Sequence, residues 1–168
     1  MSLVDPILAE LDHEAKTTRR ILERVPGDKL GWKPHAKSMS LGTLALHMAQ
    51  VPGNIAGFVI GPVFEMPEGA SFAPKEAAST AEIMSTLDES LAKAKSILGG
   101  LDDATIMSMW SFKAGGKTMM TMPRMGVIRA IMLNHWYHHR GQLSVYLREL
   151  DVPVPSIYGP SADENPFA

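Results

Sequence analysis

The sequence predicts an all-α protein in which four amphipathic helices pack as a four-helix bundle, with a short β-hairpin before the last helix. Two observations lead to this fold class. Apolar residues recur at three- and four-residue spacing in four separate segments. Capping patterns, prolines and glycines mark where these segments begin and end. With 168 residues, of which 45% are hydrophobic, the chain is long enough to bury a core, and we expect residues 1–168 to form one domain.

The first helix is expected at about residues 6–25. One face of it carries the apolar positions Val4, Ile7, Leu8, Leu11, Ala15, Thr18, Leu22 and Val25. Asp5 precedes Pro6, which predicts a capping carboxylate followed by proline at the first helical position. Pro26 and Gly27 then end the helix.

The second helix is expected to begin at Ser40 or Leu41 and to reach about residue 59. Pro52 lies inside its apolar pattern and predicts a kink, because proline removes one backbone hydrogen bond. Loops are expected on both sides of this helix, at residues 28–40 and at residues 61–74, which are rich in Pro and Gly.

The third helix starts with a capping-box pattern, Ser79-Thr80-Ala81-Glu82, and stops at Gly99-Gly100. In residues 106–122, Met and Trp residues flank Ala114-Gly115-Gly116-Lys117, which indicates a β-hairpin. The fourth helix is expected at about residues 123–150.

The sequence argues against cysteine-based metal sites, a signal peptide and a membrane-spanning segment. There is no cysteine, so a bound metal has to be held by histidine or carboxylate. The N-terminus lacks the pattern of a signal peptide. The longest weakly polar stretch, residues 51–64, is too short to span a bilayer and is broken by Pro and Gly. We therefore expect a soluble, cytoplasmic protein with no membrane partner.

Positive charge gathers in one part of a chain whose net charge is −2. Residues 105–148 contain no Asp or Glu but six basic side chains: Lys113, Lys117, Arg124, Arg129, Arg140 and Arg148. Two interpretations stay open, a helix with a basic solvent face and a positive surface that attracts an anionic substrate. A nucleic-acid partner is not expected, because the overall charge is slightly negative and no recognition motif is present.

Two histidines one helical turn apart mark the fourth helix. His135 and His139 are four residues apart, so both rings lie on nearly the same face and can bind one ion. His138 competes by spacing alone. At roughly 100° per residue, the apolar positions of this helix place His135 and His139 near the centre of its buried face and His138 on the edge. Two core histidines bonded to backbone or to Gln142 are the alternative, because a buried imidazole needs a partner.

A third ligand has to come from another helix. His47 lies on the flank of the apolar stripe of the second helix, whereas His13 lies off the stripe of the first and His35 is in a loop. A single histidine such as His47 is more often structural, but it is the best third candidate. Three imidazoles leave one coordination position open, as in catalytic rather than structural zinc sites.

The fourth helix lacks the general base of helical metalloproteases. Those enzymes place Glu directly after the first histidine, where this chain has Trp136. No carboxylate follows in this helix until Glu149. We assign no catalytic residue, and we expect a bound metal to do the activation by lowering the pKa of water or of a thiol.

Four segments carry a family resemblance. They are Leu30-Gly31-Trp32-Lys33-Pro34-His35 with Ser38, Ser40-Leu41-Gly42-Thr43-Leu44 through His47, Asn134 to Leu147 with its His-His-Arg-Gly-Gln-Leu core, and Val154 to Glu164. In these segments the sequence resembles the DinB-like proteins, a family of four-helix-bundle metalloenzymes named for a damage-inducible bacterial member. The resemblance covers nearly the whole chain.

The resemblance implies a bundle with a long crossover connection and a metal, usually zinc or nickel, held by three histidines at one end. The ligands fall on His47, His135 and His139. Relatives include S-transferases that use low-molecular-weight thiols and a hydrolase that acts on a thiol conjugate. Gln142, one turn beyond His139, is a candidate to orient that ring.

Two functional interpretations remain. The first is a metal-dependent hydrolase or thiol S-transferase whose three-histidine site activates water or a small thiol for a small-molecule substrate. The second is a non-catalytic metal-binding helical bundle with a structural, sensing or stress-response role, for which a homodimer is the expected assembly. An open coordination position favours the enzyme.

Overall fold

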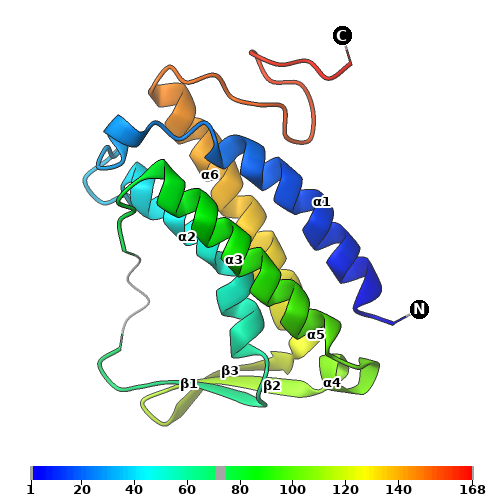
Figure 1. Cartoon of the computed structure of the whole chain (residues 1–168). Helices are drawn as coiled ribbons and strands as arrows, with labels where there is room; N and C mark the ends of the chain where they lie inside the picture. Colours follow the sequence, from blue (N-terminus) through cyan, green and yellow to red (C-terminus); the bar gives the residue numbers. More distant parts are fainter. Residues whose placement is uncertain (1, 71–74, 168) are drawn as a thin grey trace.

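The computed structural model describes residues 2–70 and 75–167, and this part of the chain is mostly helical with a small three-stranded sheet (Figure 1). Its long helices are α1 (Asp5–Leu22), α2 (Leu41–Phe58), α3 (Thr80–Gly99) and α6 (His135–Glu149). Helices α1 and α2 each pack against both α3 and α6. No helix in the described ranges is long and apolar enough to cross a bilayer.

The expected cap of α1 is wrong. Asp5 is the first residue of the helix, and its carboxylate accepts a hydrogen bond from the backbone N–H of Ser2 at 2.8 Å rather than from the first helical turn. The helix also ends earlier than expected. The backbone N–H of Val25 donates to the carbonyl of Leu22 at 3.1 Å, so the last expected turn is a tighter, non-α turn.

The start of α3 confirms its capping prediction, and α2 begins where expected, with Ser40 as its cap. Ser40 Oγ accepts the backbone N–H of Thr43 at 3.1 Å. Ser79 Oγ accepts the backbone N–H of Glu82, also at 3.1 Å. Each side chain replaces a hydrogen bond that the first helical turn cannot make by itself, which explains why both helices begin where the sequence indicates.

Helix α2 continues through Pro52 and packs closely on α3. Ser90 Oγ on α3 accepts the N–H of Gly53 at 2.8 Å and donates to the carbonyl of Gln50 at 3.2 Å. A Cβ atom on Gly53 would lie 2.9 Å from the Cα atom of Ser90. Glycine is therefore required here by the close approach of the two helices.

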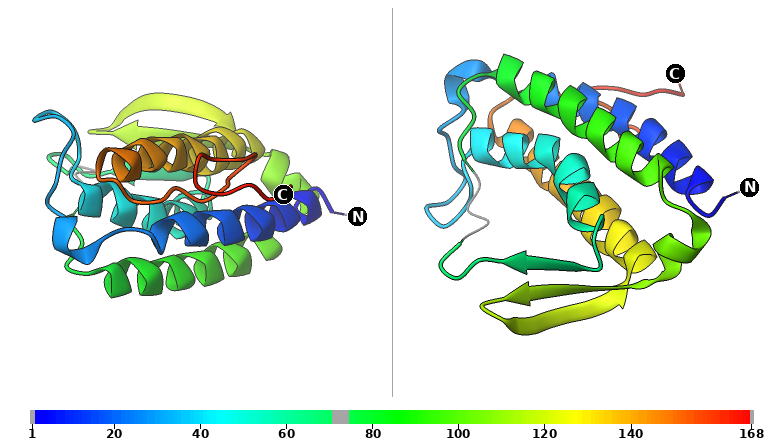
Figure 2. Two further views of the ribbon diagram at one scale, coloured as in Figure 1. Left: turned by 90° about the horizontal axis from the view of Figure 1, so that it is seen from above. Right: turned by 60° about the horizontal axis from the view of Figure 1, so that its bottom comes forward.

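The sheet contains the expected hairpin and one strand that was not expected. Strand β2 (Met109–Ala114) is antiparallel to β3 (Lys117–Pro123), and Gly115 and Gly116 adopt positive φ values of 54° and 75° in the turn. The short helix α4 (Asp103–Met107) precedes it, where the hairpin was expected to start. Strand β1 (Val63–Met66) pairs in parallel with β2. Figures 1 and 2 show the sheet lying across one end of the long helices.

Strand β1 corrects the prediction of a loop at residues 61–74. Its four residues lie between Pro62 and Pro67, so the local sequence carries turn signals and no strand pattern. The strand forms because a distant segment, β2, offers backbone partners. Residues 71–74 of the expected loop lie outside the described residues.

The single helix expected at residues 123–150 is divided into three parts. A short α-helix, α5 (Arg124–Val127), is followed by a π-helical segment, η2 (Ile128–Asn134), and then by α6. A π-helix has more residues per turn than an α-helix and often occurs at functional sites. The apolar pattern runs through all three parts, so the change of helix type was not visible in the sequence.

Candidate metal centre

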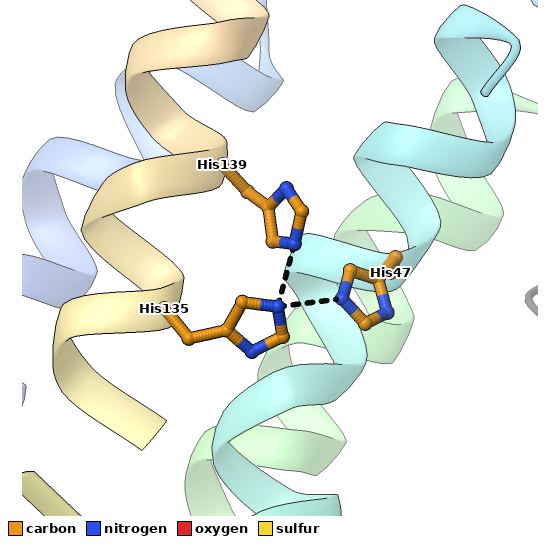
Figure 3. A group of neighbouring side chains, drawn as sticks. All are labelled: His47, His135 and His139. Atoms are coloured by element: carbon orange, nitrogen blue, oxygen red, sulfur yellow. Dashed lines mark hydrogen bonds between the residues drawn. The ribbon is translucent and has the colours of Figure 1, made fainter. Parts of the chain in front are cut away.

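The structure brings together the three histidines that the sequence singled out (Figure 3). His47 comes from α2, and His135 and His139 come from consecutive turns of α6. The Nε2 atom of His135 lies 3.4 Å from Nε2 of His47 and 2.6 Å from Nε2 of His139. One ring nitrogen of each histidine lies within 4.8 Å of the other two, so the group could hold a metal ion.

The outer nitrogens of the two α6 histidines point at oxygen acceptors. Nδ1 of His139 lies 2.6 Å from Oε1 of Gln142. Nδ1 of His135 lies 3.3 Å from the carbonyl oxygen of Ile131. A neutral imidazole carries one N–H, so donation from both Nδ1 atoms leaves both Nε2 atoms as bare acceptors.

Bare Nε2 atoms at these distances suit a cation. Two lone pairs facing each other at 2.6 Å repel, unless a positive ion lies between them. Nitrogens bound at about 2.1 Å to one tetrahedral ion are separated by roughly 3.4 Å. The pair formed by His47 and His135 has this spacing, at 3.4 Å, and the pair formed by His135 and His139 reaches it by opening slightly. The three side chains therefore fit a divalent metal.

Burial keeps the cluster neutral. Loss of hydration, followed by the like charges of His139 and His135, lowers the pKa of His47 to about 4. Burial is also the main cause that lowers the pKa values of His135 and His139. At neutral pH each ring is therefore unprotonated at one nitrogen, which is the form that binds a metal.

The π-helical segment η2 explains the orientation of His135. In a regular α-helix the backbone N–H of residue 135 would donate to the carbonyl of Ile131. Here it donates to the carbonyl of Met132 instead. The carbonyl oxygen of Ile131 accepts a hydrogen bond from Nδ1–H of the His135 ring. The irregular helix thus supplies the acceptor that sets the tautomer.

The other histidines do not join the group. His138 is exposed, and its ring centroid lies 5.1 Å from that of His139. His13 is exposed on α1, and His35 is exposed in the loop before α2, where its Nδ1 accepts the backbone N–H of Lys37. The choice of His139 over His138 as the inward residue is therefore confirmed. Metal binding by the three assembled histidines remains a prediction.

The six basic side chains of residues 105–148 do not form one positive surface. Arg124 is only 5% exposed and Arg140 only 1%. Three arginines pair with carboxylates from other segments: Arg129 with Glu10, Arg140 with Glu14, and Arg148 with Asp163. Burial of Arg124 and Arg140 and pairing with acidic residues from other segments therefore leave only part of this stretch as exposed positive charge, and attraction of an anionic substrate stays a prediction.

Arg140 has a role that the sequence reasoning missed. Its guanidinium pairs with Glu14 and donates to Oγ1 of Thr18 at 3.2 Å, both on α1. It also lies 5.1 Å from the ring centroid of Tyr137 and 4.8 Å from that of Tyr158, in the C-terminal segment. The sequence feature that could have predicted this buried ion pair is Glu14, a carboxylate within the apolar stripe of the first helix, where it needs a basic partner.

A pocket of about 620 Å³ opens beside His47 and His135. Helix α2, the sheet and η2 form its walls, which are mainly apolar. No Asp or Glu in the described ranges lines this pocket or belongs to the histidine group. The site therefore combines neutral ring nitrogens with an apolar cavity.

The fold and the site together define a mostly helical protein with a three-histidine group suited to a divalent cation. A model of the DinB family matches residues 1–166. The chain belongs to the DinB family, as its sequence motifs indicated.

Individual relatives agree with this assignment. The uncharacterized protein YrdA of Bacillus subtilis is 26% identical over 161 residues, which cover 96% of this chain and 91% of YrdA. A DinB-like protein of B. subtilis, YjoA, has a solved structure with a TM-score of 0.67 at 19% identity, covering 89% of this chain and 96% of that one. A DinB-like protein from Bacillus cereus also gives 0.67, at 22% identity, with coverage of 90% and 95%. The two structures are similar to this chain in fold.

Proposed function

We propose that His47, His135 and His139 hold one zinc or nickel ion, and that the metal-loaded protein transfers a small thiol to an electrophile or hydrolyses a related conjugate. The observation that carries the proposal is the convergence of three neutral ring nitrogens, two of them with their outer nitrogens bonded to oxygen. Such outer bonds orient metal ligands and set their tautomers.

The proposal places the site in a single domain of residues 1–168, built as a four-helix bundle from α1, α2, α3 and α6. Its long crossover is the connection from α3 to α6, which contains the hairpin. In this arrangement the metal would join α2 to α6.

The chemistry follows from what the site contains and what it lacks. A bound divalent ion would act as a Lewis acid that lowers the pKa of a thiol or of water. The described residues around the site include no carboxylate and the chain has no cysteine, so the protein supplies neither a general base nor a nucleophile of those types. The histidines hold the ion, while Gln142 and the carbonyl of Ile131 hold the rings.

The test is a panel of low-molecular-weight thiols against electrophilic acceptors and thiol conjugates. Rates would be measured for metal-loaded protein, chelated protein and the variants His47→Ala and His13→Ala. We expect activity in the metal-loaded wild type and in His13→Ala, whose histidine is exposed on α1, and background rates in the other two. Equal rates in all four would favour the rival, a non-catalytic metal-binding protein with a structural or sensing role, acting as a homodimer.

A further inference from the structure

The pocket beside the histidines has the dimensions and lining of a small-molecule site. Its volume of about 620 Å³ lies within the range of roughly 300–1,000 Å³ that is usual for such sites. We propose that it binds the non-reacting part of the substrate and that this part is an uncharged aromatic or alkyl group. The inference rests on the proposed function in one respect, since it takes the reacting end of the substrate to lie at the metal.

One wall of the pocket is a single stripe of α2. His47 is followed at helical spacing by Val51, Ile55 and Phe58, all of which line the pocket. Gln50 and Asn54 flank the stripe. A ligand lying along α2 with its head at the histidines would therefore meet apolar side chains for the rest of its length.

The opposite wall is the inner face of the sheet. Phe64, Phe112 and Met120 line the pocket from β1, β2 and β3. The rings of Phe58 and Phe64 stack with their centroids 4.0 Å apart, and those of Phe64 and Phe112 are 6.0 Å apart and nearly parallel. The side chains that the three strands contribute thus make this wall of the pocket apolar.

The pocket lining contains few partners for a charged group on the substrate. Trp110 lines the pocket, but its Nε1 donates to the carbonyl of Phe58 at 2.8 Å, so its polar atom is already bonded. Lys75 is the one Lys, Arg, Asp or Glu among the described lining residues. Its side chain is 77% exposed and lies 3.7 Å from Glu82. A carboxylate carried into the pocket would lose hydration without a buried partner, which is costly.

The test uses three probes that share one metal-binding head. Acetohydroxamate has no tail, 4-phenylbutyrohydroxamate has an aromatic tail, and the monohydroxamate of glutaric acid ends in a carboxylate. With zinc-loaded wild type we expect the phenyl probe to bind at least tenfold more tightly than acetohydroxamate, because its tail leaves water for the apolar pocket. The carboxylate probe should gain nothing. Affinities would be measured by titration calorimetry.

Two substitutions on β3 form a matched pair. Met120 lines the pocket, whereas its neighbour Met119 is outside the lining and 56% exposed. Met120→Trp should fill the pocket and abolish the advantage of the phenyl probe with zinc content unchanged, and Met119→Trp should retain that advantage. Circular dichroism and melting temperature would check the fold of both, and the wild-type series decides the proposal even when a variant does not fold.

Repeating the series with chelated protein separates this inference from the proposed function. A phenyl preference that persists without metal supports the pocket, and it does so even if the protein never binds zinc. Equal affinity for the phenyl probe and acetohydroxamate, in both loaded and chelated wild type, would overturn the inference while leaving the metal site standing. Equal loss of the preference in both Trp variants would also overturn it.

Discussion

At the scale of single residues, hydrogen bonds on the outer ring nitrogens decide what the inner nitrogens can do. The side-chain oxygen of Gln142 and the carbonyl oxygen of Ile131 accept hydrogen bonds from Nδ1–H of His139 and His135, and the Nε2 atoms of these two rings face each other as acceptors. A core pair of histidines serving only to satisfy each other would need an N–H between the two Nε2 atoms. The observed partners favour a cation in that place.

The first prediction distinguishes the two neighbouring histidines of α6. His139→Ala should lower metal content after dialysis at least tenfold, because it removes a ring nitrogen from the group. His138→Ala should change it little, since His138 is exposed. Elemental analysis of both purified variants is the measurement, and an equal loss in the two would contradict the assignment.

The second prediction concerns Gln142. Its replacement by Leu removes the acceptor of His139 Nδ1 and should weaken metal binding by about 10- to 100-fold. Competition with a chromophoric chelator would give the affinity. Ser144→Ala, on the same helix, is the control because its hydroxyl donates to the carbonyl of Gly141 and lies outside the histidine group. Unchanged affinity in Gln142→Leu would show that the ring needs no outer partner.

At the scale of helices, two irregular turns lie near the histidine group. One is the π-helical segment η2, and the other is the turn of α2 that contains Pro52. At the end of the π-helical segment η2 the backbone N–H of His135 donates to Met132, while the ring of the same residue donates to the carbonyl of Ile131. Across from it, Pro52 has no N–H to give to the carbonyl of Met48, four residues earlier. Trp136 of α6 donates its Nε1–H to that carbonyl at 2.9 Å. The residue that stands where metalloproteases have Glu therefore joins α6 to α2.

The third prediction is a double-mutant cycle on this pair. Trp136→Phe should destabilise the protein by about 1–3 kcal/mol, because the buried Met48 carbonyl loses its donor. In the Pro52→Ala background the new backbone N–H can bond that carbonyl, so the same substitution should cost about 1 kcal/mol less. Urea unfolding of the four proteins measures the coupling. Strict additivity would mean that the backbone N–H introduced by Pro52→Ala does not replace the indole as donor to the Met48 carbonyl, and a negligible cost of Trp136→Phe by itself would mean that the indole hydrogen bond contributes nothing.

The fourth prediction compares a buried ion pair with a surface one. The buried pair joins α1 to α6, and the surface pair joins α1 to η2. Arg140→Gln should cost about 3–5 kcal/mol, because it leaves Glu14 buried without its partner. Arg129→Gln breaks the more exposed pair with Glu10 and should cost less than about 1 kcal/mol. Denaturant titration gives both values. Similar small costs would show that α1 does not depend on Arg140.

At the scale of the whole molecule, the histidine group spans two helices that are distant in sequence. His47 on α2 and His135 on α6 are 88 residues apart in the chain. A metal bound to both would bind the native state far better than the unfolded chain, in which the ligands are dispersed. Binding energy would therefore appear as folding stability.

The fifth prediction is the thermal consequence of this linkage. Metal at about 100 times its Kd adds roughly 2.7 kcal/mol of stability, and in a protein of this size each kcal/mol corresponds to about 2–4 °C. Chelation should thus lower the melting temperature by roughly 5–10 °C, and zinc or nickel should restore it. His47→Ala should show no response to added metal. A chelated wild type that melts unchanged would exclude a stabilising metal.

The sequence by itself determined what depends on neighbours three or four residues away. It located four amphipathic segments, the start of α2, the serine cap of α3, and the glycine turn between β2 and β3. It also selected His139 over His138, because the period of the helix alone decides which of the two shares the buried face. The position of His47 on the flank of the apolar stripe of α2 made it the best third candidate, and the family resemblance implied the same residue.

Tertiary structure alone decided the features that depend on partners far along the chain. Strand β1 exists because β2 lies beside it, Glu14 is buried because Arg140 reaches it, and Trp136 bonds a carbonyl that Pro52 left without a donor. The pocket has the same origin, since its walls come from α2, the sheet and η2. An apolar pattern records which face of an element is buried but not which element covers it, and that pairing depends on the packing of the whole chain.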